Sequence, residues 1–205
     1  MDFFAKLNST SVRDQAAAAI FLRGQGTKGL KHLSLLLQKC QAIDQYTELN
    51  RNEEALLGLG AITLGSLIAE AGFNEIDPLH NAILCWILES TNSPSISVAG
   101  HSVYALGRLS NESSVARERL CEIIISDLRG DEHEHVSLRA VALRLLRRID
   151  PNLAATFVEA PAFEEYVHAV KHWTATDALK NSDASLELQS ELNWLLDIKS
   201  RRTKP

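Results

Sequence analysis

The sequence is poor in the residues on which disulfide-stapled and metal-bearing folds depend. It has three cysteines and one methionine among 205 residues. Cys40, Cys85 and Cys121 lie far apart in apolar, helix-like stretches, which argues against a disulfide framework or a zinc motif and favours a reducing, cytoplasmic setting. The chain has no G-x-S-x-G nucleophile motif and no G-x-x-x-x-G-K-[ST] phosphate loop. We therefore assign no catalytic residue and expect no cofactor and no metal.

Long apolar runs are also scarce. The longest uncharged run, from Ala55 to Ala69, is shorter than the ~20 residues that a membrane span needs. Its small residues Ala61, Gly65 and Ala69 are spaced for close helix packing. The first residues, MDFFAKLNST, lack the basic region and apolar core of a signal peptide. We expect a buried core helix and no membrane partner.

Positive charge is missing from a long part of the chain. Residues 52–107 contain no lysine or arginine, although they include Glu53, Glu54, Glu70, Glu75, Asp77 and Glu89. The net charge of the whole chain is −5, which disfavours binding to nucleic acid because phosphate attraction needs a basic surface. Residues 108–150 contain eight arginines and no lysine.

The hydrophobic pattern indicates an all-α protein. Apolar residues recur at spacings of three and four residues, which is the helical period, and only EIIIS (122–126) looks like a strand. Asn50 with Glu53, and Asp77 before Pro78, have the spacing of helix N-caps. We expect helices at 9–23, 28–48, 53–71, 76–90, 95–110, 113–128, 134–149, 152–173 (broken at Pro161) and 183–200.

An internal repeat runs through these helices. Four similar segments begin 40–44 residues apart, at Val12, Leu56, Val98 and Leu138. The fifth position of each segment is small, and the ninth is Ile20, Leu64, Leu106 or Leu146. Positions 1, 5, 8, 9 and 12 share one helical face, so the repeat predicts a buried stripe with small residues where helices approach closely.

The segments VRDQAAAAI and VYALGRL resemble the second helix of HEAT repeats, which reads Val-Arg-x-x-Ala-Ala-x-Ala-Leu-Gly-x-Leu. The resemblance covers about residues 9–150, and the period near 40 fits this family. Arg13 and Arg139 occupy the arginine position of the family, whereas Leu57 and Ala99 depart from it. The resemblance implies a short right-handed α-solenoid of four to five helix pairs; an irregular helical bundle is the alternative. We expect one domain over residues 1–200 and a flexible basic tail at 201–205.

Arginines gather on a second face of the later repeats. Positions 4, 7 and 11 hold His101, Tyr104 and Arg108 in the third segment, then Val141, Arg144 and Arg148 in the fourth. In HEAT proteins the second helices line the concave binding surface, and arginine binds carboxylate or phosphate through two hydrogen bonds. The candidate partner-binding residues are therefore His101, Tyr104, Arg108, Arg144 and Arg148. Alternatively, these arginines pair with Glu112, Glu118, Glu122 or Asp150 inside the protein.

Three other clusters have weaker support as sites, the two histidine groups for a metal ion and a glycine-rich segment for an anion. His133 and His135 lie among acidic residues, and Glu164, His168 and His172 share a helix face, but caps and a solvated face explain both groups. The glycine-rich segment 24–29 suits a turn between helices as well as an anion site.

The sequence thus leaves two classes of function open. The first is a non-catalytic module that binds another protein on a concave surface, as an adaptor or as an inhibitor or immunity-type protein. The second is an enzyme on a HEAT-like scaffold, similar to alkylpurine DNA glycosylases or bilin lyases. A glycosylase would need a broadly basic groove, which the acidic block opposes.

Overall fold

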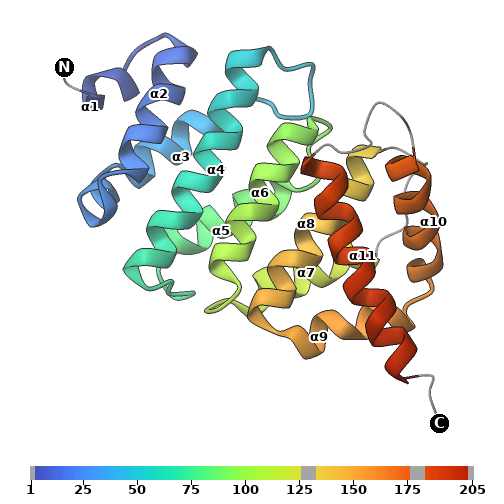
Figure 1. Ribbon diagram of the computed structural model, residues 1–205. Coiled ribbons are helices and arrows are strands. Elements are labelled where there is room, and N and C mark those ends of the chain that lie inside the picture. Colours follow the sequence, from blue (N-terminus) through green and yellow to red (C-terminus); the bar gives the residue numbers. More distant parts are fainter. Residues whose placement is uncertain (1–2, 126–132, 176–182, 203–205) are drawn as a thin grey trace. The chain divides into compact units, whose positions relative to one another are not determined.

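The computed structural model describes residues 3–125, 133–175 and 183–202, and within these ranges it contains helices and no strand (Figure 1). The chain forms two compact units, residues 1–117 and 118–205. Each unit is described below by itself, and the single domain expected over residues 1–200 stays a prediction. The helices are α1 Phe3–Leu7, α2 Val12–Arg23, η1 Gly26–His32 (a 3-10 helix), α3 Leu33–Gln41, α4 Arg51–Ala71, α5 Pro78–Ser90, α6 Ile96–Leu109, α7 Ser114–Ile125, α8 His133–Ile149, α9 Pro151–Ala155, η2 Thr156–Glu159 (3-10), α10 Ala162–Ala175 and α11 Asp183–Arg202.

Helix α4 is the centre of the first unit. It packs against α2 on one side and α6 on the other, and also contacts α3 and α5 (Figure 1). Close approach is possible because α4 carries glycines at its contacts. A Cβ added to Gly65 would lie 2.9 Å from the Cβ of Ala105 on α6. On the opposite side, the Thr63 hydroxyl donates to the Ala19 carbonyl of α2 at 3.0 Å.

The long apolar run is part of this core. Helix α4, Arg51–Ala71, is long and apolar enough to cross a membrane by length and composition alone, and it is the one such helix among the described residues. However, Leu56, Leu57, Leu64 and Leu67 are all at most 1 % exposed inside the first unit. The structure therefore uses α4 as a core helix, as its length predicts.

The predicted caps are confirmed. The Asn50 side chain accepts from the Glu53 N–H while the Glu53 carboxylate accepts from the Asn50 N–H, which is a capping box. Asp77 caps α5 ahead of Pro78. Its Oδ1 accepts from the N–H groups of Leu79 at 2.8 Å and His80 at 3.1 Å. These caps satisfy amides that have no partner inside the helix.

The cap of α5 predicts a pH dependence. The N–H groups of His80 and Leu79 lower the pKa of Asp77 below its ordinary value because they favour the charged carboxylate. The stabilising contribution is thus present above the unfolded pKa, about 3.9, and is lost as pH falls through the lower folded value. Asp77→Ala should reduce the melting temperature at neutral pH, and this difference from wild type should shrink in acid. A difference that is constant from neutral to acidic pH would contradict the assignment.

One prediction about the early helices is wrong, and one short helix was not predicted. The helix expected over 28–48 is a 3-10 helix followed by α3, which ends at Gln41. Beyond it, Asp44 accepts from the Tyr46 N–H at 3.0 Å and its carbonyl accepts from the Thr47 hydroxyl at 2.8 Å. Such local hydrogen bonds compete with a helix. The short helix α1 was not expected.

The buried stripe is confirmed in α4 and α6 but not in α2. Every stripe position of α4 and α6 is buried. In α2, Ile20 is 56 % exposed, whereas Gln15, expected on the other face, is 7 % exposed and donates to the Ser9 carbonyl at 2.6 Å. Helices α1 and η1 also contact α2. The additional neighbours change which face of α2 is buried.

The second unit is organised around α8, which contacts α9, α10 and α11. Its core includes Phe157, Phe163 and Tyr166, each at most 3 % exposed. The ring of Phe157 meets those of Phe163 and Tyr166 edge to face, with centroids 5.9 and 5.7 Å apart, a favourable aromatic geometry. Arg139, which occupies the arginine position of the HEAT resemblance, is 1 % exposed and donates to the Ala162 carbonyl at 3.5 Å.

Helix α11 is tied to the rest of the second unit by ion pairs. Glu187 and Glu191 pair with arginines of α8, Lys199 pairs with Glu164 of α10, and Arg202 pairs with Glu159 of η2. The first two residues of the expected tail, 201 and 202, are the last residues of this helix. Residues 203–205 lie outside the described part of the chain.

Candidate functional site

The first three candidate residues lie on one side of α6. Tyr104 is 41 % exposed, and Arg108 is exposed. Among the residues that the structure describes, Arg108 has no ion-pair or hydrogen-bond partner. His101 is half-buried, and its Nδ1 lies 2.5 Å from the Ser97 carbonyl oxygen. Because a carbonyl oxygen only accepts, Nδ1 must carry a proton in this contact.

Helix α4 extends this surface. A Cβ added to Gly58 would lie 2.9 Å from His101 Nδ1, so the glycine makes room for the imidazole. Leu59 and Ile62 are half-buried and occupy the same repeat positions on α4 as His101 and Tyr104 on α6. We refer to Leu59, Ile62, His101, Tyr104 and Arg108 as the α4–α6 face. It combines apolar contact area with one cationic group.

The corresponding positions of α2 do not continue the face. Gln15, Ala18 and Leu22 are all buried, and α1 and η1 both contact α2. The face is therefore open over α4 and α6 and closed at the N-terminal end of the first unit. Leu59 and Ile62 are not among the candidates chosen from the sequence, although repeat positions 4 and 7 place them on this face.

The other two candidates, Arg144 and Arg148, belong to the second unit. Arg144 Nη1 lies 2.6 Å from Glu187 Oε2, and Arg148 is exposed. The alternative in which an arginine pairs inside the protein thus holds for Arg144, and Glu187 of α11 is not among the acidic residues named above. The five candidates fall in different units, so their grouping into one patch stays a prediction.

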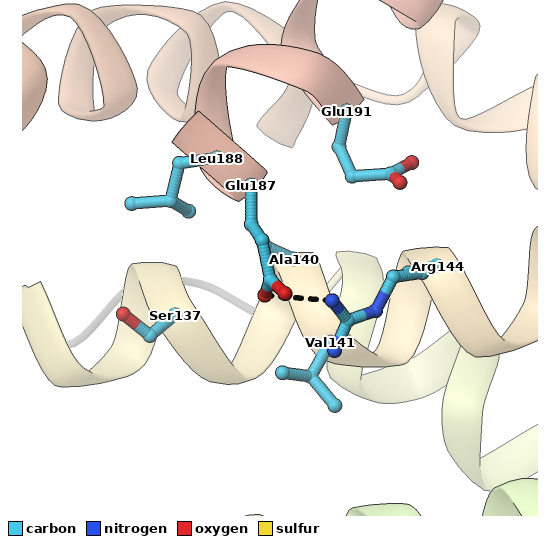
Figure 2. Close-up of a pocket in the computed structure, with 7 residues that line it drawn as sticks. All are labelled: Ser137, Ala140, Val141, Arg144, Glu187, Leu188 and Glu191. Atoms are coloured by element: carbon cyan, nitrogen blue, oxygen red, sulfur yellow. Dashed lines mark ion pairs between the residues drawn. The ribbon is translucent and has the colours of Figure 1, made fainter. Parts of the chain in front are cut away.

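A pocket of about 190 Å³ lies between α8 and α11. It is lined by Ser137, Ala140, Val141, Arg144, Glu187, Leu188 and Glu191. Figure 2 shows the Glu187 carboxylate reaching across from α11 to the guanidinium of Arg144, with Glu191 one turn further along the same helix. The three residues from α11 are not among the candidates chosen from the sequence, because the resemblance to the repeat ends near residue 150.

Glu191 is the most buried acid of this pocket. It is 7 % exposed, and its Oε2 accepts from Arg147 Nη1 at 3.2 Å. The guanidinium carbon of Arg147 lies 4.5 Å from the centre of the Trp194 ring, a cation–π distance. Burial raises the pKa of Tyr166, and the charge of Glu191 raises it further, against the lowering effect of Arg139.

The remaining clusters carry less chemistry. The side chains of His133 and His135 lie outside the described residues. His168 and His172 are exposed, Glu164 is paired with Lys199, and the described residues hold no group of three metal-ligating side chains. In the glycine-rich segment, a Cβ on Gly29 would lie 2.8 Å from the Leu22 carbonyl oxygen, so close packing accounts for this glycine.

Cysteine chemistry does not point to a site either. Cys40 is fully buried, and burial raises the pKa of its thiol, which makes it a poor nucleophile. Cys85 is exposed on α5, although it lies in an apolar stretch of sequence.

Comparison with known proteins adds no family. No family model, no curated protein and no solved structure matches the chain.

Proposed function

We propose that the protein is a non-catalytic interaction module, a short HEAT-like α-solenoid that binds another protein on the surface of its second helices. The helix order supports this architecture, because α2, α4 and α6 occupy equivalent repeat positions and each packs on the next. A reducing, cytoplasmic location fits the buried thiol of Cys40. Nothing in this proposal requires a cofactor.

The observation that carries the proposal is the exposed and unpaired state of the Arg108 side chain among the described residues. An exposed arginine with no partner among the described residues contributes little to the fold. It lies one turn from Tyr104, and exposed tyrosine and arginine are the side chains that most often dominate protein interfaces. The α4–α6 face therefore suits a partner segment that offers an apolar side chain and a carboxylate, which would pair with the guanidinium.

A broadly basic groove, as a DNA glycosylase would need, is not what this face offers. Its five side chains include one arginine and two aliphatic residues, and segment 52–107, which supplies the other four side chains, holds no lysine or arginine. Strong phosphate attraction needs several cationic contacts. The composition of the face favours protein binding.

The test is a charge reversal on the full chain. Arg108→Glu should weaken binding of a partner, purified after capture by the wild-type protein, by about tenfold or more. The melting temperature should change little because the side chain is exposed. Titration calorimetry with wild type and variant measures the difference.

Arg13→Glu is the matched control, since Arg13 is also exposed but lies on α2, away from the α4–α6 face. It makes the same charge change and should leave the affinity unchanged. Equal losses in both variants would indicate a general charge effect, and unchanged binding of Arg108→Glu would exclude this face as the binding surface.

A further inference from the structure

The pocket between α8 and α11 plays no part in the function proposed above. All of its lining residues lie in the second unit, and the α4–α6 face lies in the first. Of the side chains that line it, Glu187 and Glu191 are acidic and Arg144 is basic. Arg147, which lies outside the lining, pairs with Glu191, so the two acids are balanced by two arginines and recognition depends on a free carboxylate oxygen rather than on net charge.

Glu191 supplies the recognition element. One of its oxygens, Oε2, accepts from Arg147, while the other, Oε1, has no hydrogen-bond partner among the described residues. Oε1 is not among the fully buried polar atoms that lack a partner, so it stays accessible to a hydrogen-bond donor. The pocket thus offers an acceptor that a ligand carrying N–H groups would satisfy.

Arg144 does not make the pocket a site for anions. Its guanidinium is held by Glu187 at 2.6 Å, and its side chain is 18 % exposed. To bind an anion, it would have to exchange a short charge-assisted hydrogen bond inside the protein for another. Binding a cation requires no such exchange, because Glu191 lines the pocket and its Oε1 has no hydrogen-bond partner among the described residues.

The rest of the lining sets the shape of the ligand. Ala140, Val141 and Leu188 form an apolar wall, and a cavity of about 190 Å³ has space for a chain of about five heavy atoms rather than for a single ion. A short alkyl chain would lie along this wall while its charged end reaches Glu191. This combination is found in the side chain of lysine and in short free amines.

We propose that the α8–α11 pocket binds a primary alkylammonium group, with its nitrogen donating to Glu191 and its methylenes packed on Val141 and Leu188. The same chemistry is available from a lysine side chain of a partner protein and from a free aliphatic diamine. The two sources share the recognition step and differ in what lies beyond the alkyl chain. Comparing their affinities separates them.

The experiment titrates the full chain, labelled with ¹⁵N, with n-butylammonium chloride at constant ionic strength and follows amide shifts by NMR. Saturable shifts confined to residues 137–144 and 187–191 are expected. 1-Butanol has the same alkyl chain without the charge and should produce no saturable shift there. Parallel titrations use a lysine-containing blocked tripeptide and 1,4-diaminobutane, and the tighter of these two ligands identifies the source.

Glu191→Gln keeps the shape of the side chain and removes its charge. Its Kd for n-butylammonium should rise at least tenfold, since a charge-assisted hydrogen bond is lost. Glu165→Gln is the matched control, because Glu165 is an exposed glutamate of α10 outside the pocket lining, and it should bind as wild type does. The spectrum of each free variant shows whether it is folded.

Three results would overturn the proposal: no saturable shift with any of the three amines, shifts that map outside the pocket, or equal affinity of wild type and a folded Glu191→Gln. None of these outcomes bears on the α4–α6 face, whose variants are tested separately.

Discussion

Replacing Gly65 with valine should destabilise the protein by about 3 kcal/mol. A Cβ at this position would lie 2.9 Å from the Cβ, 3.2 Å from the Cα and 3.3 Å from the carbonyl oxygen of Ala105. Two of these atoms are backbone, so α6 as a whole would have to move. Helix α4 cannot easily withdraw, because Thr63 is bonded to α2 on its other side. Valine adds two more methyl groups to the same contact.

Urea denaturation followed by circular dichroism measures this loss. Gly24→Val is the matched control, because Gly24 is exposed, has a helical φ of −69° and meets nothing closer than 3.4 Å at the position of its Cβ. Its effect should stay within about 0.5 kcal/mol. If the two variants unfold at the same urea concentration, the α4–α6 contact is looser than described.

Truncating Phe163 to alanine should cost about 3–5 kcal/mol. The ring is 1 % exposed, contacts Phe157 edge to face and lies beneath the ammonium of Lys199 at 4.6 Å from the ring centre. Its removal leaves a cavity where α10, α11 and η2 meet, and it also removes the aromatic surface on which the cation rests. Hydrogen exchange should rise across α10 and α11.

Tyr46→Ala provides the comparison, since it removes an aromatic ring that is 59 % exposed and should change stability by about 0.5 kcal/mol or less. Hydrogen exchange monitored by mass spectrometry localises the effect of each variant. Unchanged protection of α10 and α11 in Phe163→Ala would show that the ring is not part of the core of the second unit.

Helix positions were largely predictable because local signals set them. Asn50, with Glu53, and Asp77, with Pro78, mark helix starts through hydrogen bonds that span only three residues, so no knowledge of the rest of the fold is needed. The break near Pro161 is also local, because proline lacks an N–H. The structure places the end of η2 and the start of α10 on either side of Pro161.

The burial of α2 was not predictable in the same way. Its repeat pattern places Ile20 in the buried stripe, yet the side chain is 56 % exposed. As the first of the repeated helices, α2 contacts α1 and η1 in addition to α4. Which face of a helix is buried depends on its neighbours. A pattern of buried positions taken from the middle repeats therefore predicts the wrong buried face for the first helix.

Some residues of the candidate sites could also be predicted from the sequence, and others could not. Tyr104 and Arg108 could be selected from sequence because repeat position alone places them on the outer side of α6. The pairing of Arg144 with Glu187 joins side chains 43 residues apart in sequence. No periodicity connects α8 to α11, so neither the ion pair nor the pocket beside it could be predicted.

The sequence by itself determined that this protein is all-helical, where most helices begin, and that α4 and α6 share a buried stripe, because caps, prolines and periodicity act over a few residues. The tertiary structure decided which glycines mark close contacts, which arginines are already paired and that Glu191 lines a pocket. These properties depend on distances between side chains from helices remote in sequence, which only the packed fold establishes.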